Sequence, residues 1–384
     1  MLADKRILVV GAGFSGAVIA RELAEAGFSV DVIEERGRVA GNCYTERDSE
    51  TDITVHVHGP HIFHTDDLEV WKFVNRFGNM VPFINEVKAT VGGKVYTLPV
   101  NLLTINQFFG TALNPTEARE FIRGKTSDIK DIVSFEDQAL AFVGSELYEA
   151  FFKGYTLKQW GIHPRELPAS ILKRLPLRFN YDANYFAHKY QGMPAEGYTS
   201  IIQNMLSHDG IRVSLKRPFS HADRANYAHV FYTGKLDGWF DYRAGRLGYR
   251  TLDFEISRHD GDYQGCAVMN YTDENTPYTR VTEHKYFTPW EKHEKTIVYH
   301  EYSRECLAQD LPYYPIRLVG EQAVLRNYVD LAEKEAGVSF IGRLATYRYL
   351  DMDVTIAEAL QAARKYISCV QNDSRMPAFY VAPL

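Results

Sequence analysis

Glycines at a fixed spacing near the N-terminus are the first residues whose types and positions point to chemistry. They stand at Gly11, Gly13 and Gly16, after an apolar segment (residues 7–10) and before a helical pattern (residues 17–24). The first glycine permits a tight turn, the second lets the backbone approach a pyrophosphate, and the third lets helix and strand pack closely. The helix N-terminus then offers unpaired N–H groups to phosphates. The spacing therefore predicts a βαβ unit that binds a dinucleotide.

An acid and a basic loop follow at the positions that a dinucleotide needs. Glu34 ends the next predicted strand, residues 30–34, and its carboxylate can accept hydrogen bonds from a ribose. Residues 35–42 then form a short basic loop that contains glycine. In many FAD-binding proteins such a loop wraps back over the cofactor phosphates, although Ala40 stands here where a first glycine is usual. The pattern favours FAD over NAD.

Composition limits the broad class of the protein. The chain has 384 residues, of which 45% are hydrophobic and 24% charged, and a net charge of -6. We expect a soluble globular protein of two or three domains that does not bind nucleic acid. The N-terminal apolar run is too short for a membrane span and lacks a signal-peptide layout, so we expect no membrane partner and a cytoplasmic location. The four cysteines show no C-x-x-C pair, which argues against a zinc site and a disulfide framework.

Two histidines, His61 and His64, follow a Gly-Pro turn. They could ligate a metal ion, but no further Cys, Asp or His in the sequence completes a recognisable ligand set, so no metal site is predicted. They could instead be neutral imidazoles that hydrogen-bond near a flavin, or histidines with a purely structural role. The sequence favours the flavin interpretation and leaves the structural one open.

Basic and aromatic residues in the middle of the chain suit anion and base binding. Arg174 and Arg178 lie between apolar residues, where a diphosphate clamp and a pair of surface charges are both possible. Residues 147–161 form a dense aromatic run that could be helix core or a wall that stacks on a base. Arg280 lies in a stretch of alternating short strands and could project from a sheet into a pocket.

The elements that must position these residues follow from periodicity. The pattern predicts a hairpin with a Gly-Gly turn over residues 88–99. It predicts a helical region over residues 101–173 and an antiparallel sheet over residues 245–283. The pattern of residues 338–341 predicts a final strand, which Gly342 and Arg343 follow directly. Thr355 and Glu358 fit a capping box at the start of a terminal helix. This strand, turn and helix predict a second anion-binding site, suited to the polar edge of a flavin.

Longer motifs closely resemble the bacterial UDP-galactopyranose mutase family. The similar segments are residues 59–65, 151–160, 278–280, 342–343 and 347–352, and the match extends over nearly the whole chain. The resemblance implies an α/β fold in which a Rossmann-like FAD-binding domain carries an inserted helical domain and an antiparallel β-sheet domain. The approximate boundaries are 1–80, 195–235 and 335–384 for the FAD-binding domain, 101–175 for the helical domain, and 81–100, 176–194 and 236–334 for the sheet domain.

The same resemblance implies an activity. Members of the family are cytoplasmic homodimers that interconvert UDP-galactopyranose and UDP-galactofuranose for cell-surface polysaccharides. We therefore expect a flavin-dependent isomerase with FAD as cofactor, active when the flavin is reduced. The expected route is ring contraction through an adduct between flavin N5 and the sugar, without net redox change.

Residue roles also follow from the resemblance. The diphosphate would meet Arg174 and Arg280, Tyr155 would stack on uracil, and His64 matches the histidine of galactose-selective members. The expected catalytic residues are Arg174, Arg280, His61 and His64. The expected substrate-binding residues are Phe151, Phe152, Tyr155, Thr156, Trp160, Arg174, Tyr185, Asn270, Arg280, Tyr314, Tyr349 and Asn85. The expected cofactor-binding residues are Gly11, Gly13, Phe14, Ser15, Gly16, Glu34, Glu35, Arg36, Gly41, Asn42, His61, Ile62, Arg343, Tyr349, Leu350, Asp351 and Met352.

Two other functions share parts of this pattern. A flavin-dependent oxidase or dehydrogenase of the amine-oxidase type begins with the same βαβ unit, and fold alone does not exclude it. Paired arginines with uridine-type aromatics argue against it, because an amine substrate needs neither. A non-catalytic regulator that binds FAD or a nucleotide-sugar is the second alternative.

Overall fold

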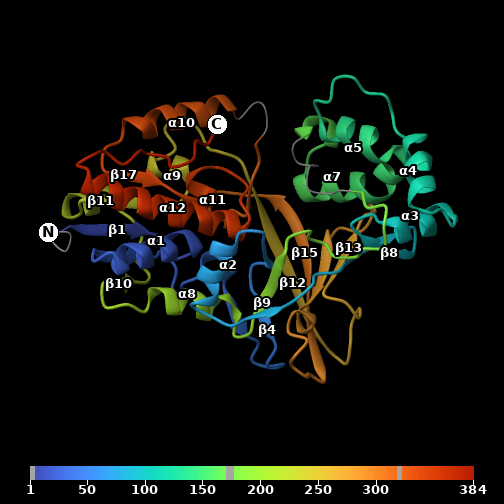
Figure 1. The fold of residues 1–384 in the computed structure, drawn as a ribbon, viewed down its shortest axis with the longest axis horizontal. Helices are drawn as coiled ribbons and strands as arrows, with labels where there is room; N and C mark the ends of the chain where they lie inside the picture. Colours follow the sequence, from blue (N-terminus) through green and yellow to red (C-terminus); the bar gives the residue numbers. More distant parts are fainter. Residues whose placement is uncertain (1–4, 170–176, 318–321) are drawn as a thin grey trace.

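The computed structural model describes residues 5–169, 177–317 and 322–384. The chain forms a parallel sheet flanked by helices, a long twisted sheet beside it, and a group of helices at the far end of that second sheet (Figure 1). None of the helices in these ranges combines the length and the apolar composition that a bilayer crossing requires.

The parallel sheet contains the predicted dinucleotide-binding unit. Its strand order is β10-β2-β1-β11-β17, and all neighbouring pairs are parallel. The strands are β1 (Arg6–Val10), β2 (Ser29–Ile33), β10 (Ile211–Ser214), β11 (His229–Tyr232) and β17 (Val338–Phe340). Helix α1 (Phe14–Glu25) connects β1 to β2, so the βαβ unit predicted from the glycine spacing is confirmed.

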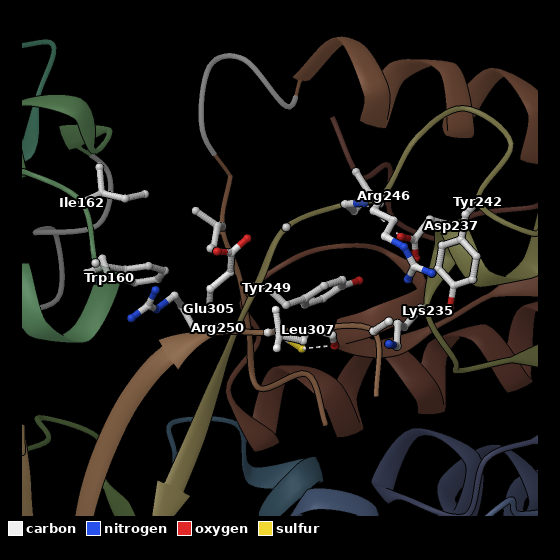
Figure 2. A pocket seen from close by; sticks show the side chains of 16 residues that line it. Trp160, Ile162, Lys235, Asp237, Tyr242, Arg246, Tyr249, Arg250, Glu305 and Leu307 are labelled. Atoms are coloured by element: carbon white, nitrogen blue, oxygen red, sulfur yellow. Dashed lines mark hydrogen bonds between the residues drawn. The ribbon is translucent and has the colours of Figure 1, made fainter. Parts of the chain in front are cut away.

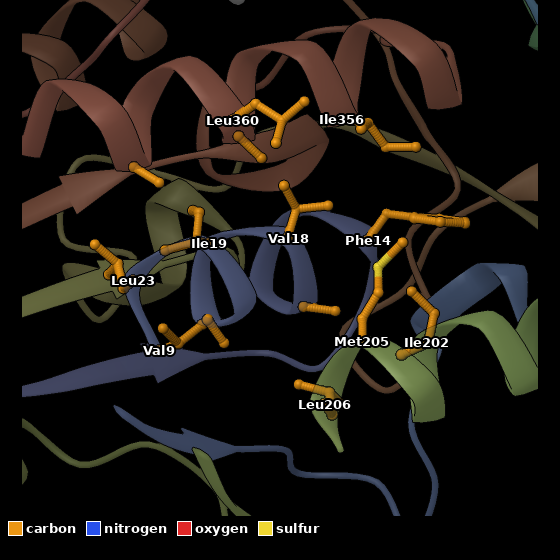
Figure 3. Close-up of a cluster of buried hydrophobic side chains, with 14 of the residues drawn as sticks. Val9, Phe14, Val18, Ile19, Leu23, Ile202, Met205, Leu206, Ile356 and Leu360 are labelled. Atoms are coloured by element: carbon orange, nitrogen blue, oxygen red, sulfur yellow. The ribbon is translucent and has the colours of Figure 1, made fainter. Parts of the chain in front are cut away.

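The core beside this sheet lies between α1 and two helices that cover it. These helices are α8 (Gly197–Leu206) and α12 (Met352–Gln371). Figure 3 shows Val18 of α1 facing α12, which contributes Ile356 and Leu360, while Met205 of α8 approaches from the other side. The packing fixes the N-terminal end of α1, on which the glycine turn depends.

The terminal helix begins earlier than the sequence predicted. Its N-cap is Asp351, and the amide of Thr355 donates to the Asp351 carbonyl oxygen at 3.0 Å, inside the first turn. Glu358 forms an ion pair with Arg348 and takes no part in capping. The predicted capping box of Thr355 and Glu358 is therefore wrong. The chain already reverses at Tyr347, which has a φ of 48°.

The second sheet has seven strands in the order β16-β12-β15-β14-β13-β7-β8. Their bounds are β7 (Val87–Val91), β8 (Lys94–Leu98), β12 (Tyr249–Asp260), β13 (Val268–Tyr271), β14 (Arg280–Glu283), β15 (Lys295–Glu305) and β16 (Tyr314–Pro315). The predicted hairpin is β7–β8, and Gly92 and Gly93 have φ of 55° and 74° in its turn. The sheet is antiparallel as predicted, except that β13 pairs with β7 in parallel.

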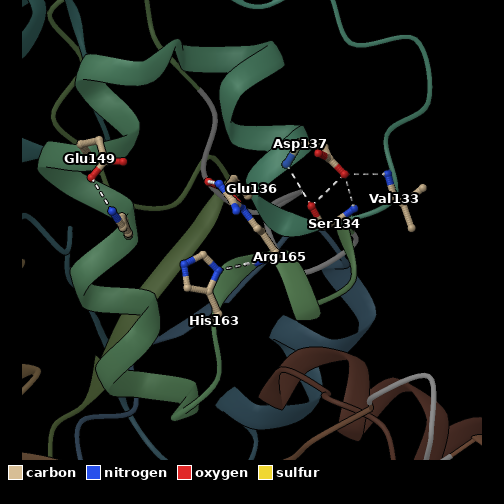
Figure 4. A network of polar contacts seen from close by, with 8 residues as sticks. Val133, Ser134, Glu136, Asp137, Glu149, His163 and Arg165 are labelled. Atoms are coloured by element: carbon tan, nitrogen blue, oxygen red, sulfur yellow. Dashed lines mark hydrogen bonds and ion pairs between the residues drawn. The ribbon is translucent and has the colours of Figure 1, made fainter.

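Helices occupy the described part of the region for which they were predicted, at the upper right of Figure 1. They are α3 (Leu102–Phe109), α4 (Pro115–Arg123), α5 (Phe135–Val143), α6 (Ser145–Leu147), the π-helix η3 (Tyr148–Lys153) and α7 (Gly154–Trp160). Ser134 caps α5, since its side chain accepts from the Asp137 amide at 3.1 Å and Asp137 accepts from the Ser134 amide at 2.9 Å (Figure 4). Arg165 pairs with Glu136, so the segment that follows α7 is held against α5.

Further strands and helices complete the fold. Four of them carry or border the site residues: β4 (Thr54–His56), β5 (Phe63–Thr65), β9 (Tyr190–Pro194) and α11 (Gly342–Ala345). The others are β3 (Thr45–Arg47), α2 (Leu68–Asn75), β6 (Met80–Pro82), α9 (Leu236–Trp239) and α10 (Gln322–Lys334). Strand β9 lies between β5 and β6 and pairs with both in antiparallel fashion, so residues 190–192 lie opposite residues 63–65 and residues 192–194 lie opposite residues 80–82.

Candidate functional site

Gly11 and Gly13 flank a buried Ala12 in the turn that follows β1, so few side chains cover the backbone there. A Cβ on Gly16 would lie 1.9 Å from the Gly11 carbonyl oxygen, so only glycine allows this contact. Gly13 faces Gly41, because a Cβ added to Gly41 would lie 3.4 Å from the Gly13 Cα atom. Ala40, where a glycine is usual, adopts a φ of 78° and keeps the loop in the turn that a glycine would form. The backbone therefore has the shape that a pyrophosphate needs for close approach.

Glu34 and Arg36 complete this cradle with charge. The Glu34 carboxylate accepts hydrogen bonds from the amides of Ala12 and Arg36, both at 2.9 Å. One Arg36 nitrogen, Nη2, donates to Asn42 Oδ1 at 3.1 Å, whereas Nη1 is buried and has no hydrogen-bond partner among the described residues. A buried guanidinium N–H without a partner suits an anion. The cradle thus fits the phosphates and ribose of FAD.

Seven more predicted cofactor residues lie in different surroundings. Ser15 approaches Gly342 at the start of α11, since a Cβ there would lie 2.4 Å from Ser15 Oγ. Phe14 belongs to the hydrophobic core, and Glu35 is exposed. Ile62, Leu350, Asp351 and Met352 lie on the loops and the helix end that follow β4 and α11.

Arg343 links several of these segments. Its Nη1 donates to the Tyr313 carbonyl oxygen at 3.2 Å, its Nη2 donates to the Leu350 carbonyl oxygen at 2.5 Å, and its guanidinium lies 5.0 Å from the centre of the Tyr349 ring. A fixed positive charge therefore lies beside the N-terminal end of α12, where the sequence predicted a second anion site.

His61 is held as a neutral imidazole. Its Nδ1 donates to the Gly59 carbonyl oxygen at 2.8 Å, which leaves Nε2 as the acceptor. Burial, together with the nearby Arg343, lowers the pKa of His61 to about 4. This agrees with the predicted neutral imidazole. His64 lies on β5 with a different partner, because its Nδ1 is 2.7 Å from Nδ1 of His188.

Arg280 lies at the centre of a row of polar residues across three strands. It stands opposite Asn270 of β13 and Glu301 of β15, so these three residues share one face of the sheet. Arg280 Nε donates to Glu301 Oε2 at 2.7 Å, and the Glu301 side chain is only 1% exposed. Burial lowers the pKa of Arg280, but the Glu301 carboxylate outweighs this effect and raises it. Sequence reasoning missed Glu301, whose signal was an acid inside an apolar strand pattern.

Predicted substrate tyrosines gather around Arg280. The rings of Tyr314 and Tyr349 stack with centroids 5.7 Å apart, and Trp160 lies 6.5 Å from Tyr314. Burial raises the pKa of Tyr155 and of Tyr314, in each case against the effect of Arg280. Both phenols therefore stay protonated at neutral pH. A guanidinium and phenol O–H groups in one place form a set of donors suited to a diphosphate.

Asn85 and Tyr185 lie next to each other on this side of the molecule. The Tyr185 amide donates to the Asn85 carbonyl oxygen at 2.8 Å. The Asn85 side chain is 2% exposed, and its Oδ1 accepts no hydrogen bond from any described residue. A buried acceptor of this kind fits a donor on a ligand.

Part of the aromatic run of residues 147–161 forms helix core, one of the two purposes that the sequence left open. Phe151 packs in the core against Tyr96 and Phe108, with ring centroids 5.3 Å and 5.5 Å away. Phe152 and Thr156 are also buried. Tyr155 lies near Arg280 and Tyr349. The roles of all four residues beside uridine remain predictions.

A cavity of about 420 Å³ is lined by Trp160 and Ile162 on one side and by Lys235 and Arg246 on the other (Figure 2). Arg250 of β12 lines it and was missed by sequence reasoning. Arg250 Nε donates to the Gln159 carbonyl oxygen at 3.1 Å and to Ser303 Oγ at 3.2 Å. Arg250 therefore fixes the C-terminal end of α7, from which Trp160 projects.

The two candidate arginines of the diphosphate clamp have different outcomes. Arg174 lies outside the described residues, so its predicted catalytic role stays a prediction. Arg178 donates to Asp182 at 2.9 Å and also to the Asn184 carbonyl oxygen. Its guanidinium stabilises a local turn, in line with the structural alternative.

Lys158 ties α7 to the loop between β13 and β14. Its Nζ donates to the carbonyl oxygens of Tyr271, Thr276 and Tyr278 at 2.8, 2.9 and 3.1 Å, and burial lowers its pKa to about 8. We expect Lys158→Met to lower the free energy of unfolding by about 2 kcal/mol, because hydrogen bonds to a charged group contribute about 1.5–3 kcal/mol.

Urea denaturation at pH 7 measures this loss, and Lys153→Met is the matched control. Lys153 lies on the preceding turn and pairs with Glu149 at 2.8 Å on the surface, so its loss should cost less than about 0.5 kcal/mol. Equal losses in the two variants would contradict the role assigned to Lys158.

Buried histidines should make the fold sensitive to mild acid. Burial lowers the pKa of five of them: His56 to well below its usual value, His58 and His229 to about 3, and His61 and His284 to about 4. Below pH 6.5 the unfolded chain binds protons that the folded chain does not. The free energy of unfolding should therefore fall from pH 6.5 to about 4, by up to about 1.4 kcal/mol per pH unit for each histidine.

Denaturation curves at a series of pH values test this expectation. His229 of β11 hydrogen-bonds Ser339 of β17 at 3.0 Å, inside the parallel sheet. In His229→Asn the free energy of unfolding should change less steeply with pH, because one of the five histidines no longer contributes. An unfolding free energy that stays constant from pH 7 to 5 would contradict the expectation.

Comparisons with known proteins agree on one family. A family model described as UDP-galactopyranose mutase matches residues 150–349, and one described as an NAD(P)-binding Rossmann-like domain matches residues 9–77. The chain is similar to a probable UDP-galactopyranose mutase of Klebsiella pneumoniae, with 59% identity over 379 residues, 98% of this chain and 99% of that one. It is also similar to dTDP-fucopyranose mutase of Escherichia coli, with 54% identity over 370 residues, 94% of this chain and 98% of that one.

One solved structure extends this agreement to the fold. The crystal structure of reduced UDP-galactopyranose mutase has a TM-score of 0.72 to this chain at 14% sequence identity. The match covers 95% of this chain and 96% of that chain. At this identity the similarity establishes the shared fold.

Proposed function

Because the chain belongs to the UDP-galactopyranose mutase family, we propose that it interconverts UDP-galactopyranose and UDP-galactofuranose. It is an isomerase of the flavoprotein class. The observation that carries the proposal is the set of donors around Arg280, all of which lie within the matched residues 150–349.

FAD is the cofactor, and the residues at the predicted site suit it. The glycine backbone at Gly13 and Gly41 would approach the pyrophosphate, Glu34 would hold the ribose, and the free Nη1 of Arg36 would meet a phosphate oxygen. When bound and reduced, FAD supplies a nucleophile for the anomeric carbon of the sugar.

Arg280 and the phenols would hold the diphosphate as it leaves the sugar. Negative charge grows on the diphosphate oxygen in this step, and a fixed guanidinium stabilises it without reorganisation. Glu301 sets the direction of Arg280 through Nε, so the two Nη atoms form the edge that faces the ligand. We propose Arg174, outside the described residues, as the second arginine of the clamp.

His61 would act on the sugar as a hydrogen-bond acceptor. Its Nδ1 proton is committed to Gly59, so Nε2 is the atom that can accept a hydroxyl hydrogen. A pKa of about 4 keeps that atom unprotonated at neutral pH. Asn85, with its unpaired buried Oδ1 in the described structure, is proposed to accept a second ligand hydrogen.

The experiment is incubation of the purified holoprotein with UDP-galactofuranose, first oxidised and then reduced with dithionite. Conversion to the pyranose only after reduction supports the mutase. Peroxide formation with an amine would support the oxidase alternative. Saturable binding without conversion would support the regulator.

The Escherichia coli relative favours a second candidate substrate, dTDP-fucopyranose. This nucleotide-sugar carries thymine in place of uracil, a 2′-deoxyribose, and a methyl group in place of the galactose CH2OH group. The hydroxyls that exchange roles on ring contraction are the same. The ratio of kcat/KM for the two pyranoses, measured with the same reduced enzyme, decides between them.

We propose the remaining features on narrower grounds. All four cysteines are free thiols, which is consistent with a cytoplasmic location. We also propose that the chain forms a homodimer, as the family resemblance implies, and light scattering after gel filtration tests it. The domain boundaries given above remain a proposal.

A further inference from the structure

A cluster of two histidines and an aspartate joins His64, one of the predicted site residues, to two residues that the sequence did not single out. His64, His188 and Asp353 each offer one ligand atom, and these atoms all lie within 4.8 Å of one another. The fold brings them together from three distant segments. His64 lies on β5, which pairs with β9, and His188 lies just before the start of β9. Asp353 lies in the first turn of α12.

The two imidazoles are held in place by their surroundings. His64 Nδ1 lies 2.7 Å from His188 Nδ1, so these two nitrogens share one hydrogen. The His64 ring also stacks on Phe186 with centroids 3.7 Å apart. On the far side of His188, its Nε2 lies 4.0 Å from Asp66 Oδ2, and Asp66 in turn accepts from the Lys189 amide at 2.7 Å. At 4.0 Å this contact is longer than a hydrogen bond, so Asp66 supplies a nearby negative charge rather than the hydrogen-bonded outer support usual for a metal ligand.

Asp353 supplies the observation that points to a ligand. Its Oδ1 is buried, and none of the described residues donates a hydrogen bond to it. A buried carboxylate oxygen needs a donor or a cation. In this cluster the donors could only be imidazole nitrogens, but Nδ1 of His64 and Nδ1 of His188 face each other.

We propose that His64, His188 and Asp353 form a binding site for a divalent transition-metal cation of the zinc type. Two imidazoles and one carboxylate are a ligand set that binds zinc and leaves the fourth position to water. On binding, the ring that carries the hydrogen on Nδ1 changes tautomer: this hydrogen is lost to solvent while Nε2 of the same ring takes one up, so both imidazoles stay neutral and the metal binds between the two Nδ1 atoms. The nitrogens must then move from 2.7 Å apart to about 3.3 Å, which follows from Zn–N bonds of about 2.0–2.1 Å and tetrahedral angles.

The test is zinc binding to the holoprotein, measured by competition with a chromogenic chelator. We expect one high-affinity Zn²⁺ per chain. His188→Ala and Asp353→Asn should each weaken binding by roughly 100-fold or more, since even a change in the outer shell of a zinc site costs about 10–100-fold. His259→Ala is the matched control, because His259 hydrogen-bonds Ser257 on β12 and should leave zinc binding unchanged.

X-ray absorption at the zinc edge on the wild-type protein needs no variant. Nitrogen and oxygen neighbours at about 2.0–2.1 Å with imidazole scattering support the site, whereas sulfur at about 2.3 Å would assign the zinc to a cysteine and overturn it. Failure of the wild type to bind zinc, or full binding by His188→Ala, would also overturn it. Retained flavin absorbance shows that each variant is folded. None of these measurements depends on mutase activity.

Discussion

Arg280→Ala should lower kcat/KM by about three orders of magnitude, or about 4 kcal/mol, while FAD stays bound. The Arg280 guanidinium places a positive charge at the centre of the tyrosine cluster, and its Nε donates a hydrogen bond to Glu301. Its loss removes the charge that stabilises the departing diphosphate. The decrease should appear in kcat as well as in KM, because this interaction strengthens as the bond to the sugar breaks.

The alanine variant also leaves a buried carboxylate without its partner, so stability must be separated from catalysis. Glu301 is 1% exposed, and removing one partner of a buried pair typically costs about 3–5 kcal/mol. The double variant Arg280→Ala/Glu301→Gln removes both charges and should regain much of the lost stability. Its activity should remain as low as that of the single variant. If activity returned together with stability, Arg280 would have a structural role only.

Arg280→Lys gives a further comparison. It keeps the positive charge but loses the planar fork that meets Glu301 with one edge and the diphosphate with the other. We expect its kcat/KM to lie much closer to that of the alanine variant than to that of the wild type. Near-normal turnover would show that a point charge is sufficient.

Gly16→Ala and Gly13→Ala should produce large effects of different kinds. A Cβ at Gly16 would lie 1.9 Å from the Gly11 carbonyl oxygen and 3.1 Å from Val9 Cγ1, so α1 must move away from β1. We expect a loss of about 3 kcal/mol or more in the free energy of unfolding, a size associated with overpacking and backbone clashes. FAD should be lost with the fold.

Gly13→Ala isolates the cofactor. Gly13 has φ -83° and ψ -171°, a conformation open to alanine, and the nearest atom to the new Cβ is Gly41 Cα at 3.9 Å. The apoprotein should therefore remain within about 1 kcal/mol of wild type. The methyl group would occupy the space into which the pyrophosphate must fit, so FAD should bind at least about 100-fold more weakly, or about 2.8 kcal/mol.

Denaturation of apoprotein and fluorescence titration with FAD measure the two quantities separately. Tight FAD binding by Gly13→Ala would remove this glycine from the phosphate site. An apoprotein as stable as wild type in Gly16→Ala would contradict the packing role of Gly16.

The sequence predicted best those features that depend on neighbours along the chain. The glycine turn, α1 and the β7–β8 hairpin each arise within one short segment, and all three are confirmed. The capping box at Thr355 failed although its pattern was correct, because the chain had already turned and started the helix at Met352. Local patterns of this kind state what a segment can do, and tertiary contacts decide where it begins.

The site itself was predictable only in part, because strand register is not written in the local pattern. Arg280 was identified as a residue that could enter a pocket, but its partner Glu301 depends on how β14 meets β15. In the same way, His64 was seen without a complete ligand set, because His188 and Asp353 reach it through pairing and packing of distant segments. The resemblance to a family supplied roles that periodicity could not supply.

The order of strands in the two sheets has a consequence for how the protein is made. Leu8 of β1 pairs with Val230, and Val87 of β7 pairs with Val268, so both early strands wait for partners that leave the ribosome much later. A nascent chain that ends at α8 carries open strand edges, which can recruit other chains. Contacts so far apart in sequence also slow folding. Truncated products of this chain should therefore aggregate rather than persist as smaller folded units.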